Sequence, residues 1–104
     1  MFIQNASGTV TFTDPLLVSG RLAGGIEITG SSGTVRFSDT VEVRDHAGVG
    51  LEAGISIHDQ LANSEVIFAD TVQVRSTAAG LSSNGNGIFL ANNVANSSVS
   101  FLDN

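Results

Sequence analysis

The segments TVTFTDPLLV (residues 9–18), TVRFSDTVEV (34–43) and EVIFADTVQV (65–74) are three versions of one ten-residue phrase. Five of the ten positions are identical between the first and second versions, and six between the second and third. A fourth version begins as SVSFLD at residues 98–103. Recurrence at intervals of 25 to 33 residues is typical of folds built by stacking one small structural unit.

Within this repeat, apolar residues alternate with polar ones in three short bursts that recur in a fixed order. Period-2 alternation predicts strands with one buried face, and no helical stripe competes with it. The first burst is V-x-F, at Val10/Phe12, Val35/Phe37, Val66/Phe68 and Val99/Phe101. The second is Leu16/Val18, Val41/Val43 and Val72/Val74. The third is Met1/Ile3, Ile26/Ile28, Ile55/Ile57 and Ile88/Leu90.

The spacings between the bursts indicate three kinds of connection. The second burst always begins four residues after the Phe, and an Asp always stands two residues after that Phe. From the third burst to the next V-x-F the distance is seven residues twice and then nine twice. The remaining connection lengthens from eight to twelve to fourteen residues. One corner is therefore constant, one is nearly constant, and one varies.

These patterns predict an all-β fold, a right-handed parallel β-helix (β-solenoid) with three short strands per coil and about three to four coils. The coils occupy approximately residues 9–33, 34–64 and 65–97, with partial coils at 1–8 and 98–104. Each inward side chain would stack on its equivalent one coil away, about 4.8 Å distant, which explains why the same residue type returns. An antiparallel sandwich gives no reason for three strand types to recur in order.

Composition narrows the functional classes. The 104 residues suit one segment with a modest core; they are 41% hydrophobic, contain no Cys and carry a net charge of −6. The acidic balance argues against nucleic-acid binding, and no apolar run is long enough to predict membrane insertion. Without Cys, disulfides, thiolate metal sites and thiol catalysis are excluded. Because residue 1 falls inside a repeat, we expect this chain to be a fragment of a longer repeat protein.

The Asp column is the most regular polar feature: Asp14, Asp39, Asp70 and Asp103. Stacked carboxylates are possible Ca²⁺ ligands. The same residues are equally the type that accepts a backbone N–H in a tight turn, repeated in each coil. Because these turns offer no further carboxylate, we interpret the column as turn-stabilising and predict no metal site and no cofactor.

The two histidines each precede or follow an Asp, in "RDHAGVG" around His46 and "HDQ" around His58. Neighbours in sequence rarely face each other, and no nucleophile or third ligand accompanies them. We therefore expect both histidines to be solvent-exposed polar residues of loops, and we predict no catalytic residue. The Gly-rich stretch SSNGNG (82–87) lacks Lys and a following helix, so it predicts a loop tip rather than a phosphate site.

Outward strand positions are mostly polar, but Leu17, Ile67 and Phe89 are apolar where contact with water is expected. We expect a folded-back loop to cover them; otherwise they form a lateral contact surface. The outward acids Glu27 and Glu42 fall on different strand types, and the chain has no Trp or Tyr to stack on sugars.

The stretches "GGIEITGSSGTVRFSDT", "AGISIHDQLANSEVIFADT" and "NGIFLANNVANSSVSFLDN" place a Gly-Ile start before an F-x-x-[TN] end. This arrangement resembles the GG-x-I and F-x-x-N repeats of bacterial polymorphic outer-membrane proteins. It is more loosely similar to the β-helical passengers of autotransporters and filamentous haemagglutinin-like adhesins. The resemblance implies a secreted or bacterial cell-surface protein, often adhesive and much longer than this chain.

Three functions are compatible with these observations. The first is a non-enzymatic structural or adhesive segment of an extracellular fibre, in which a rigid solenoid displays variable loops. Its partners would be flanking coils of the same protein and a host or cell-surface ligand. The second is a protomer that stacks on copies of itself into a filament. A lesser alternative is part of a carbohydrate-active β-helix enzyme.

Overall fold

The computed structural model describes residues 1–19, 24–44, 53–75 and 87–103. Within these ranges the chain forms eleven strands and no helix. The strands are β1 (Phe2–Gln4), β2 (Thr9–Phe12), β3 (Leu16–Ser19), β4 (Ile26–Thr29), β5 (Thr34–Phe37), β6 (Val41–Arg44), β7 (Ile55–His58), β8 (Glu65–Phe68), β9 (Val72–Arg75), β10 (Ile88–Ala91) and β11 (Ser98–Phe101).

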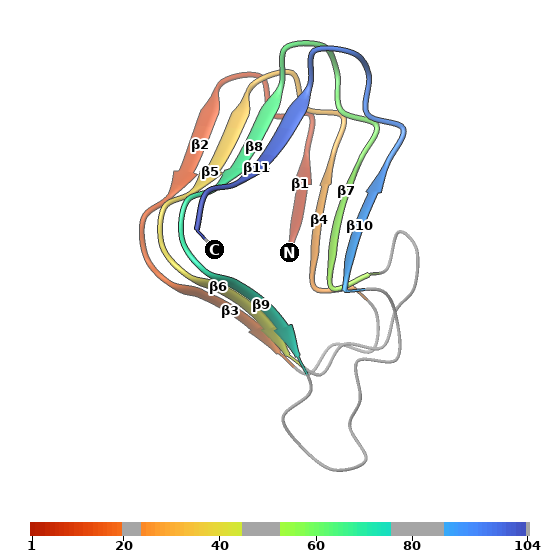
Figure 1. The fold of residues 1–104 in the computed structure, drawn as a ribbon. Coiled ribbons are helices and arrows are strands. Elements are labelled where there is room, and N and C mark those ends of the chain that lie inside the picture. Colours follow the sequence, from red (N-terminus) through yellow and green to blue (C-terminus); the bar gives the residue numbers. More distant parts are fainter. Residues whose placement is uncertain (20–23, 45–52, 76–86, 104) are drawn as a thin grey trace.

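The strands form three parallel sheets, in which each strand pairs with the strand three positions later in the chain (Figure 1). Sheet A has the order β1-β4-β7-β10, sheet B has β2-β5-β8-β11, and sheet C has β3-β6-β9. We number the rungs of the stack from sheet A, so that rung 1 is β1–β3, rung 2 is β4–β6, rung 3 is β7–β9 and rung 4 is β10–β11.

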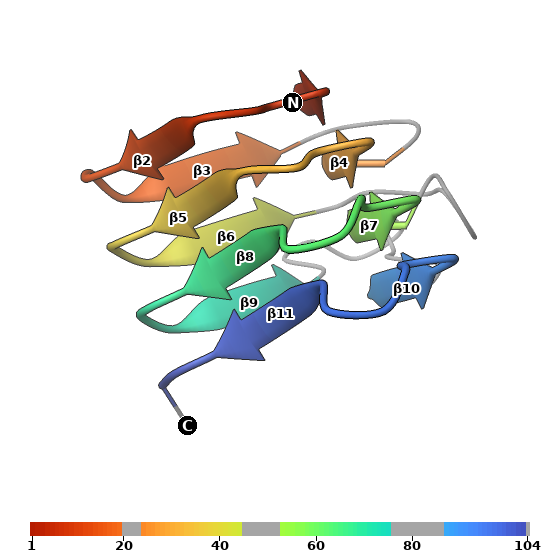
Figure 2. The ribbon, with the colours of Figure 1, turned by 90° about the horizontal axis from the view of Figure 1, so that it is seen from above.

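The winding is right-handed. In Figure 1 the chain passes anticlockwise from β1 to β2 to β3, and each later rung lies nearer to the viewer. Figure 2 shows the rungs as successive layers from the N-terminal to the C-terminal end. The prediction of an all-β parallel β-helix with three strands per coil is therefore confirmed.

The register places like residues over like residues. In sheet B, Val10 pairs with Val35, Val35 with Val66, and Val99 with Val66. The Phe residues that stand two positions after these Val residues form a continuous stack, with ring centroids 4.8–4.9 Å apart and interplanar angles of 3–8°: Phe12, Phe37, Phe68 and Phe101. Because this separation equals the spacing between parallel strands, backbone pairing and ring stacking impose the same geometry.

The core is buried in the middle of the stack and open at its ends. The inward residues of β4 to β8, the strands with a neighbour on each side, are almost completely buried: Ile26, Ile28, Val35, Phe37, Val41, Val43, Ile55, Ile57, Val66 and Phe68. Their equivalents in the end rungs are not, since Val10 is 36% exposed and Phe101 is 40% exposed. Among the described residues, no strand pairs with the outer edges of β1, β2 and β3 at one end of the stack or of β9, β10 and β11 at the other.

The corner between sheet A and sheet B depends on left-handed backbone. The residue directly after each sheet A strand has a positive φ: Asn5 (57°), Gly30 (66°), Asp59 (54°) and Asn92 (55°). Gly, Asn and Asp are the residue types that adopt this region at low cost. The two longer corners, in rungs 3 and 4, contain a second such residue, Asn63 and Asn96.

Close packing of the corners also explains Gly33. A Cβ atom at this position would lie 2.1 Å from the carbonyl oxygen of Gly8 in the rung below. The glycine therefore permits the backbones of rungs 1 and 2 to approach at this corner.

Candidate functional site

The most elaborate polar cluster surrounds His58, the last residue of β7. Since Ile55 and Ile57 face the core, Ser56 and His58 lie on the outer face of sheet A. His58 is nevertheless only 6% exposed, and Ser56 is fully buried. The expectation of an exposed loop histidine is therefore wrong for His58, because β7 is an inner strand with a neighbour on each side. His46 lies outside the described residues.

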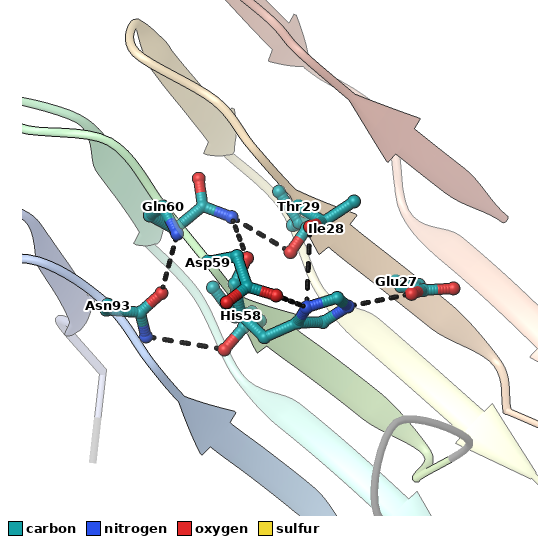
Figure 3. A network of polar contacts seen from close by, with 8 residues as sticks. Glu27, Ile28, Thr29, His58, Asp59, Gln60 and Asn93 are labelled. Atoms are coloured by element: carbon teal, nitrogen blue, oxygen red, sulfur yellow. Dashed lines mark hydrogen bonds and ion pairs between the residues drawn. The ribbon is translucent and has the colours of Figure 1, made fainter.

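Two carboxylates bind opposite edges of the His58 ring (Figure 3). The Nε2 atom lies 2.7 Å from Oε1 of Glu27 on β4, and the Nδ1 atom lies 2.6 Å from Oδ2 of Asp59. The Oγ1 atom of Thr29, which pairs with His58 in the parallel register, lies 3.4 Å from Nδ1. The His58 side chain of rung 3 is thus held by Glu27 and Thr29 of rung 2 and by Asp59, its neighbour in sequence.

The backbone explains why two residues adjacent in sequence face each other here. Asp59 occupies the left-handed corner position, with φ of 54°, so the chain leaves the extended conformation directly after His58. In a continuous strand, adjacent side chains point to opposite faces. The turn removes that alternation and brings the Asp59 carboxylate to the ring.

These contacts shift the protonation equilibrium of His58 toward the charged form. Burial of the ring opposes protonation, but the hydrogen bonds and negative charges of Asp59 and Glu27 outweigh it and raise the pKa of His58 above its ordinary value of 6.5. Carboxylate oxygens only accept hydrogen bonds, so two contacts of this kind are satisfied together only by an imidazolium, which donates from both nitrogens.

The geometry does not resemble a nucleophilic or metal centre. Both ring nitrogens are engaged by carboxylates on opposite edges, and the buried Ser56 Oγ has no hydrogen-bond partner. A general base needs a free nitrogen toward the group it deprotonates. In the part of the chain that the structure describes, no group of three or more His, Cys, Asp or Glu side chains is arranged to hold a metal ion.

Two amides extend the network into the corner between sheets A and B. Gln60, which is 1% exposed, donates from Nε2 to the carbonyl oxygens of Ile28 (2.9 Å) and His58 (3.1 Å). Asn93 repeats this role one rung further: its Nδ2 donates to the Ile57 carbonyl (3.3 Å), and its Oδ1 accepts from the Gln60 backbone N–H (3.0 Å). Rungs 2, 3 and 4 are therefore linked by side-chain amides as well as by strands.

The Asp column lies at the corner between sheets B and C. Asp39 and Asp70 each accept the backbone N–H of the following threonine, at 2.7 and 2.6 Å. Asp103 accepts a hydrogen bond from the Thr71 hydroxyl of the preceding rung (2.7 Å). These contacts are those of turn-stabilising carboxylates. No contact of this kind is seen for Asp14.

Sheet C carries a second charged cluster on its outer face. Glu42 accepts hydrogen bonds from Arg44 on the same strand (2.8 and 3.0 Å) and from Arg75 on β9 (2.5 Å). Hydrogen bonds from Arg44 and then Arg75 lower the pKa of Glu42 to about 2. A carboxyl group with this pKa is ionised at neutral pH and cannot donate a proton there. A shallow hollow of about 260 Å³, lined by Glu42, Thr40 and Thr71 among others, lies beside it.

The apolar outward residues Leu17, Ile67 and Phe89 differ in exposure. Leu17 is 51% exposed, so the expectation that a loop covers it is wrong: β3 is an edge strand, with β6 as its single neighbour in sheet C. Ile67 and Phe89 are partly buried. The stretch SSNGNG falls almost wholly outside the described residues.

A scan against protein-family models, a search of curated proteins and a search of solved structures each found no match to this chain. Among the described residues, no helix is long and apolar enough to cross a membrane. The fold defines the chain as a parallel β-solenoid, and the cluster around His58 connects two of its rungs.

The sequence reasoning missed His58, Gln60 and Asn93 as connecting residues. A signal was present for the amides. Each amide residue directly follows the Asp or Asn that comes immediately after a sheet A strand, in the pairs Asp59-Gln60 and Asn92-Asn93. No comparable signal marks the pairing of His58 with Glu27, since the two residues are 31 positions apart and each occurs at its outward column only once.

Proposed function

We propose that this chain is a non-enzymatic structural segment of an extracellular or cell-surface bacterial fibre, a rigid rod that displays its connections for adhesion. The observation that supports this most directly is the in-register stack itself. The ladders of sheets A and B are continuous through four rungs and that of sheet C through three, and in the part of the chain that the structure describes no strand pairs with the edges at either end. Parallel edges of this kind accept another strand of the same pattern.

The end faces also have the chemistry of a rung–rung interface. The last rung exposes inward-pointing Ile88, Leu90 and Phe101, and the first exposes Val10. Inside the stack, the same positions are covered by another Ile, Leu, Phe or Val. We therefore assign the occupant of each end face as a further coil of the same repeat protein, because such a coil continues both the hydrogen-bond ladders and the side-chain stacks.

The adhesive role and the bacterial surface location depend on the sequence resemblance and on the varying connection between the second and third bursts. A solenoid core of constant size with connections of eight, twelve and fourteen residues offers different contact surfaces on one side of a rigid support. Most of these connections fall outside the described residues.

Self-association is the second candidate, and the same exposed end faces favour it. A copy stacked through sheets A and B would leave the position over β9 without a strand, because sheet C has three strands and the other sheets have four. This mismatch makes a further coil of the same protein the better occupant. A role within a carbohydrate-active enzyme has less support, since Glu27 and Glu42 are both engaged in ion pairs.

Duplicating residues 34–64 within the chain tests the structural proposal. A rod segment should accept the extra coil, keep its strand content by circular dichroism, lengthen by about 5 Å in small-angle scattering and unfold at a higher temperature, because a smaller fraction of its rungs lies at an open end. Loss of the fold on duplication would contradict the proposal.

Two further measurements separate the alternatives. Sedimentation over a wide concentration range should show a monomer, and the Phe101→Lys variant should sediment like the parent; association that Phe101→Lys abolishes would instead support a self-stacking protomer. Antibodies raised against the purified chain should label intact source cells. Labelling that requires permeabilised cells would overturn the surface location.

A further inference from the structure

His58 is the point at which one rung is tied to the next by charge. The side chain comes from rung 3, and both Glu27 and Thr29 come from rung 2. It lies almost wholly out of contact with solvent, whereas the two carboxylates are partly exposed. A charge state change at this ring therefore alters a contact between rungs.

We infer that protonation of His58 fastens rung 3 to rung 2, so that this joint of the solenoid is a pH-sensitive clasp. The inference rests on the bonding geometry and does not depend on the proposed role in a fibre. It predicts that the middle of the stack is held more firmly in mildly acidic than in mildly alkaline solution.

The two protonation states differ in the number of donors. The imidazolium has two N–H groups, one for Glu27 and one for Asp59. Neutral imidazole has only one. If that N–H stays on Nδ1 toward Asp59, the nearer carboxylate at 2.6 Å, Glu27 of rung 2 faces the lone pair of Nε2 and its hydrogen bond to rung 3 is lost. If it stays on Nε2, Glu27 keeps only a hydrogen bond to an uncharged ring, which is weaker than one to an imidazolium.

The charged groups around the His58 ring are negative, and negative charges favour its protonation. On one side β4 contributes Glu27; on the other side the paired residue of β10 is Ala91, which carries no charge. The corner that follows β7 contributes Asp59. Among the described residues, the groups that act electrostatically on His58 are these two carboxylates, and both favour its protonation.

The direction of the pH dependence follows from the raised pKa of His58. The stabilisation is complete below the ordinary histidine pKa of about 6.5 and disappears as the pH rises through the higher value in the folded chain. Stability should thus fall between mildly acidic and mildly alkaline pH, over a window that begins near 6.5. Ordinary carboxylate effects have the opposite sign and are complete at lower pH.

Urea unfolding across pH 5–9 tests the clasp, with His58→Gln as the variant and His46→Gln, the other histidine, as the matched control. For the parent and His46→Gln, the unfolding equilibrium constant should rise about tenfold across this range, as expected for loss of one partly exposed charged hydrogen bond. His58→Gln should remove that rise. An equal pH dependence in His58→Gln and the parent would overturn the inference.

Carboxylate variants identify the partners without relying on the histidine variant being folded. Asp59→Asn places at the corner the residue type that Asn5 and Asn92 already provide there, so the left-handed backbone is kept. Glu27→Gln removes the charge between rungs, and Glu65→Gln on the exposed side of β8 is the control. By NMR titration, Glu27→Gln and Asp59→Asn should each lower the pKa of His58, and Glu65→Gln should not.

A parent His58 that titrates at or below the ordinary histidine value would refute the clasp, whatever the stability measurements show. So would a His58 resonance that is unaffected by both Glu27→Gln and Asp59→Asn.

Discussion

Truncation of the phenylalanine stack should cost most in the middle and least at the C-terminal end. Phe68 is fully buried and stacks on two rings, at 4.8 and 4.9 Å, whereas Phe101 stacks on one ring and is 40% exposed. Replacing a buried Phe by Ala typically costs about 3–5 kcal/mol, and each aromatic pair contributes about 0.5–1.5 kcal/mol beyond the buried area. We expect about 4–5 kcal/mol for Phe68→Ala and about 2 kcal/mol for Phe101→Ala.

Chemical unfolding followed by circular dichroism measures both values, with Phe68→Leu as the conservative comparison. A loss of 4–5 kcal/mol approaches the whole stability of a small domain, about 5–15 kcal/mol, so Phe68→Ala is expected to be mostly unfolded in mild denaturant. Phe68→Leu keeps most of the volume and should lose roughly 1.5 kcal/mol, which keeps the comparison measurable if Phe68→Ala does not fold. Equal losses for Phe68→Ala and Phe101→Ala would refute the reasoning, because burial and the number of stacked neighbours would then not control the energy.

Three further substitutions test other contacts. Gly33→Ala should destabilise the joint between rungs 1 and 2 by about 1–3 kcal/mol, because its Cβ would lie 2.1 Å from the Gly8 oxygen; Gly8→Ala, with open space around it, is the control, and equal thermal melting points would contradict this. Gln60→Ala leaves the buried Ile28 carbonyl without its amide donor and should cost about 1–3 kcal/mol in urea unfolding; an unchanged midpoint would argue against the amide link. Glu42 has a lowered pKa of about 2, so its stabilisation is present above about 4.5 and is lost as the pH falls toward 2. Glu42→Gln should therefore flatten the acid limb of the stability profile, weakly and less so in high salt, and an acid limb identical to that of the parent would exclude this role.

The sequence was sufficient for the fold because the inward positions obey one rule. A side chain such as Val35 has a Val below it and a Val above it, so the residue type repeats, and the repeat can be read directly. The Asp that stands two residues after each Phe predicted the corner between sheets B and C in the same way. Strand directions and the order of the sheets then followed from the recurrence of three distinct bursts.

The cluster around His58 could not be derived in this way. Outward positions have no repeated neighbour that forces one residue type, so Glu27, Ser56 and Phe89 occupy the same outward column with different chemistry. The contact with Asp59 also requires the left-handed turn directly after β7, which reverses the usual rule that adjacent side chains point apart. Sequence alternation alone predicts the wrong exposure for such a residue.

This difference between inward and outward positions bears on how the stack keeps its order. Identical ladders do not distinguish one rung from another: a Phe stacks equally well on any other Phe, so a misplaced rung or a rung from a second molecule would satisfy the core. The outward contacts are not interchangeable. Glu27 of rung 2 finds its histidine only on rung 3, and Glu42 of rung 2 reaches Arg75 only on rung 3. These two pairs lie on different sheets, so a shift of one rung in either direction breaks both and leaves the nearly buried His58 without Glu27. We therefore expect the ladders to supply most of the cohesion of the solenoid, and we propose that the heterogeneous polar pairs on its outer faces favour one order of rungs over the others.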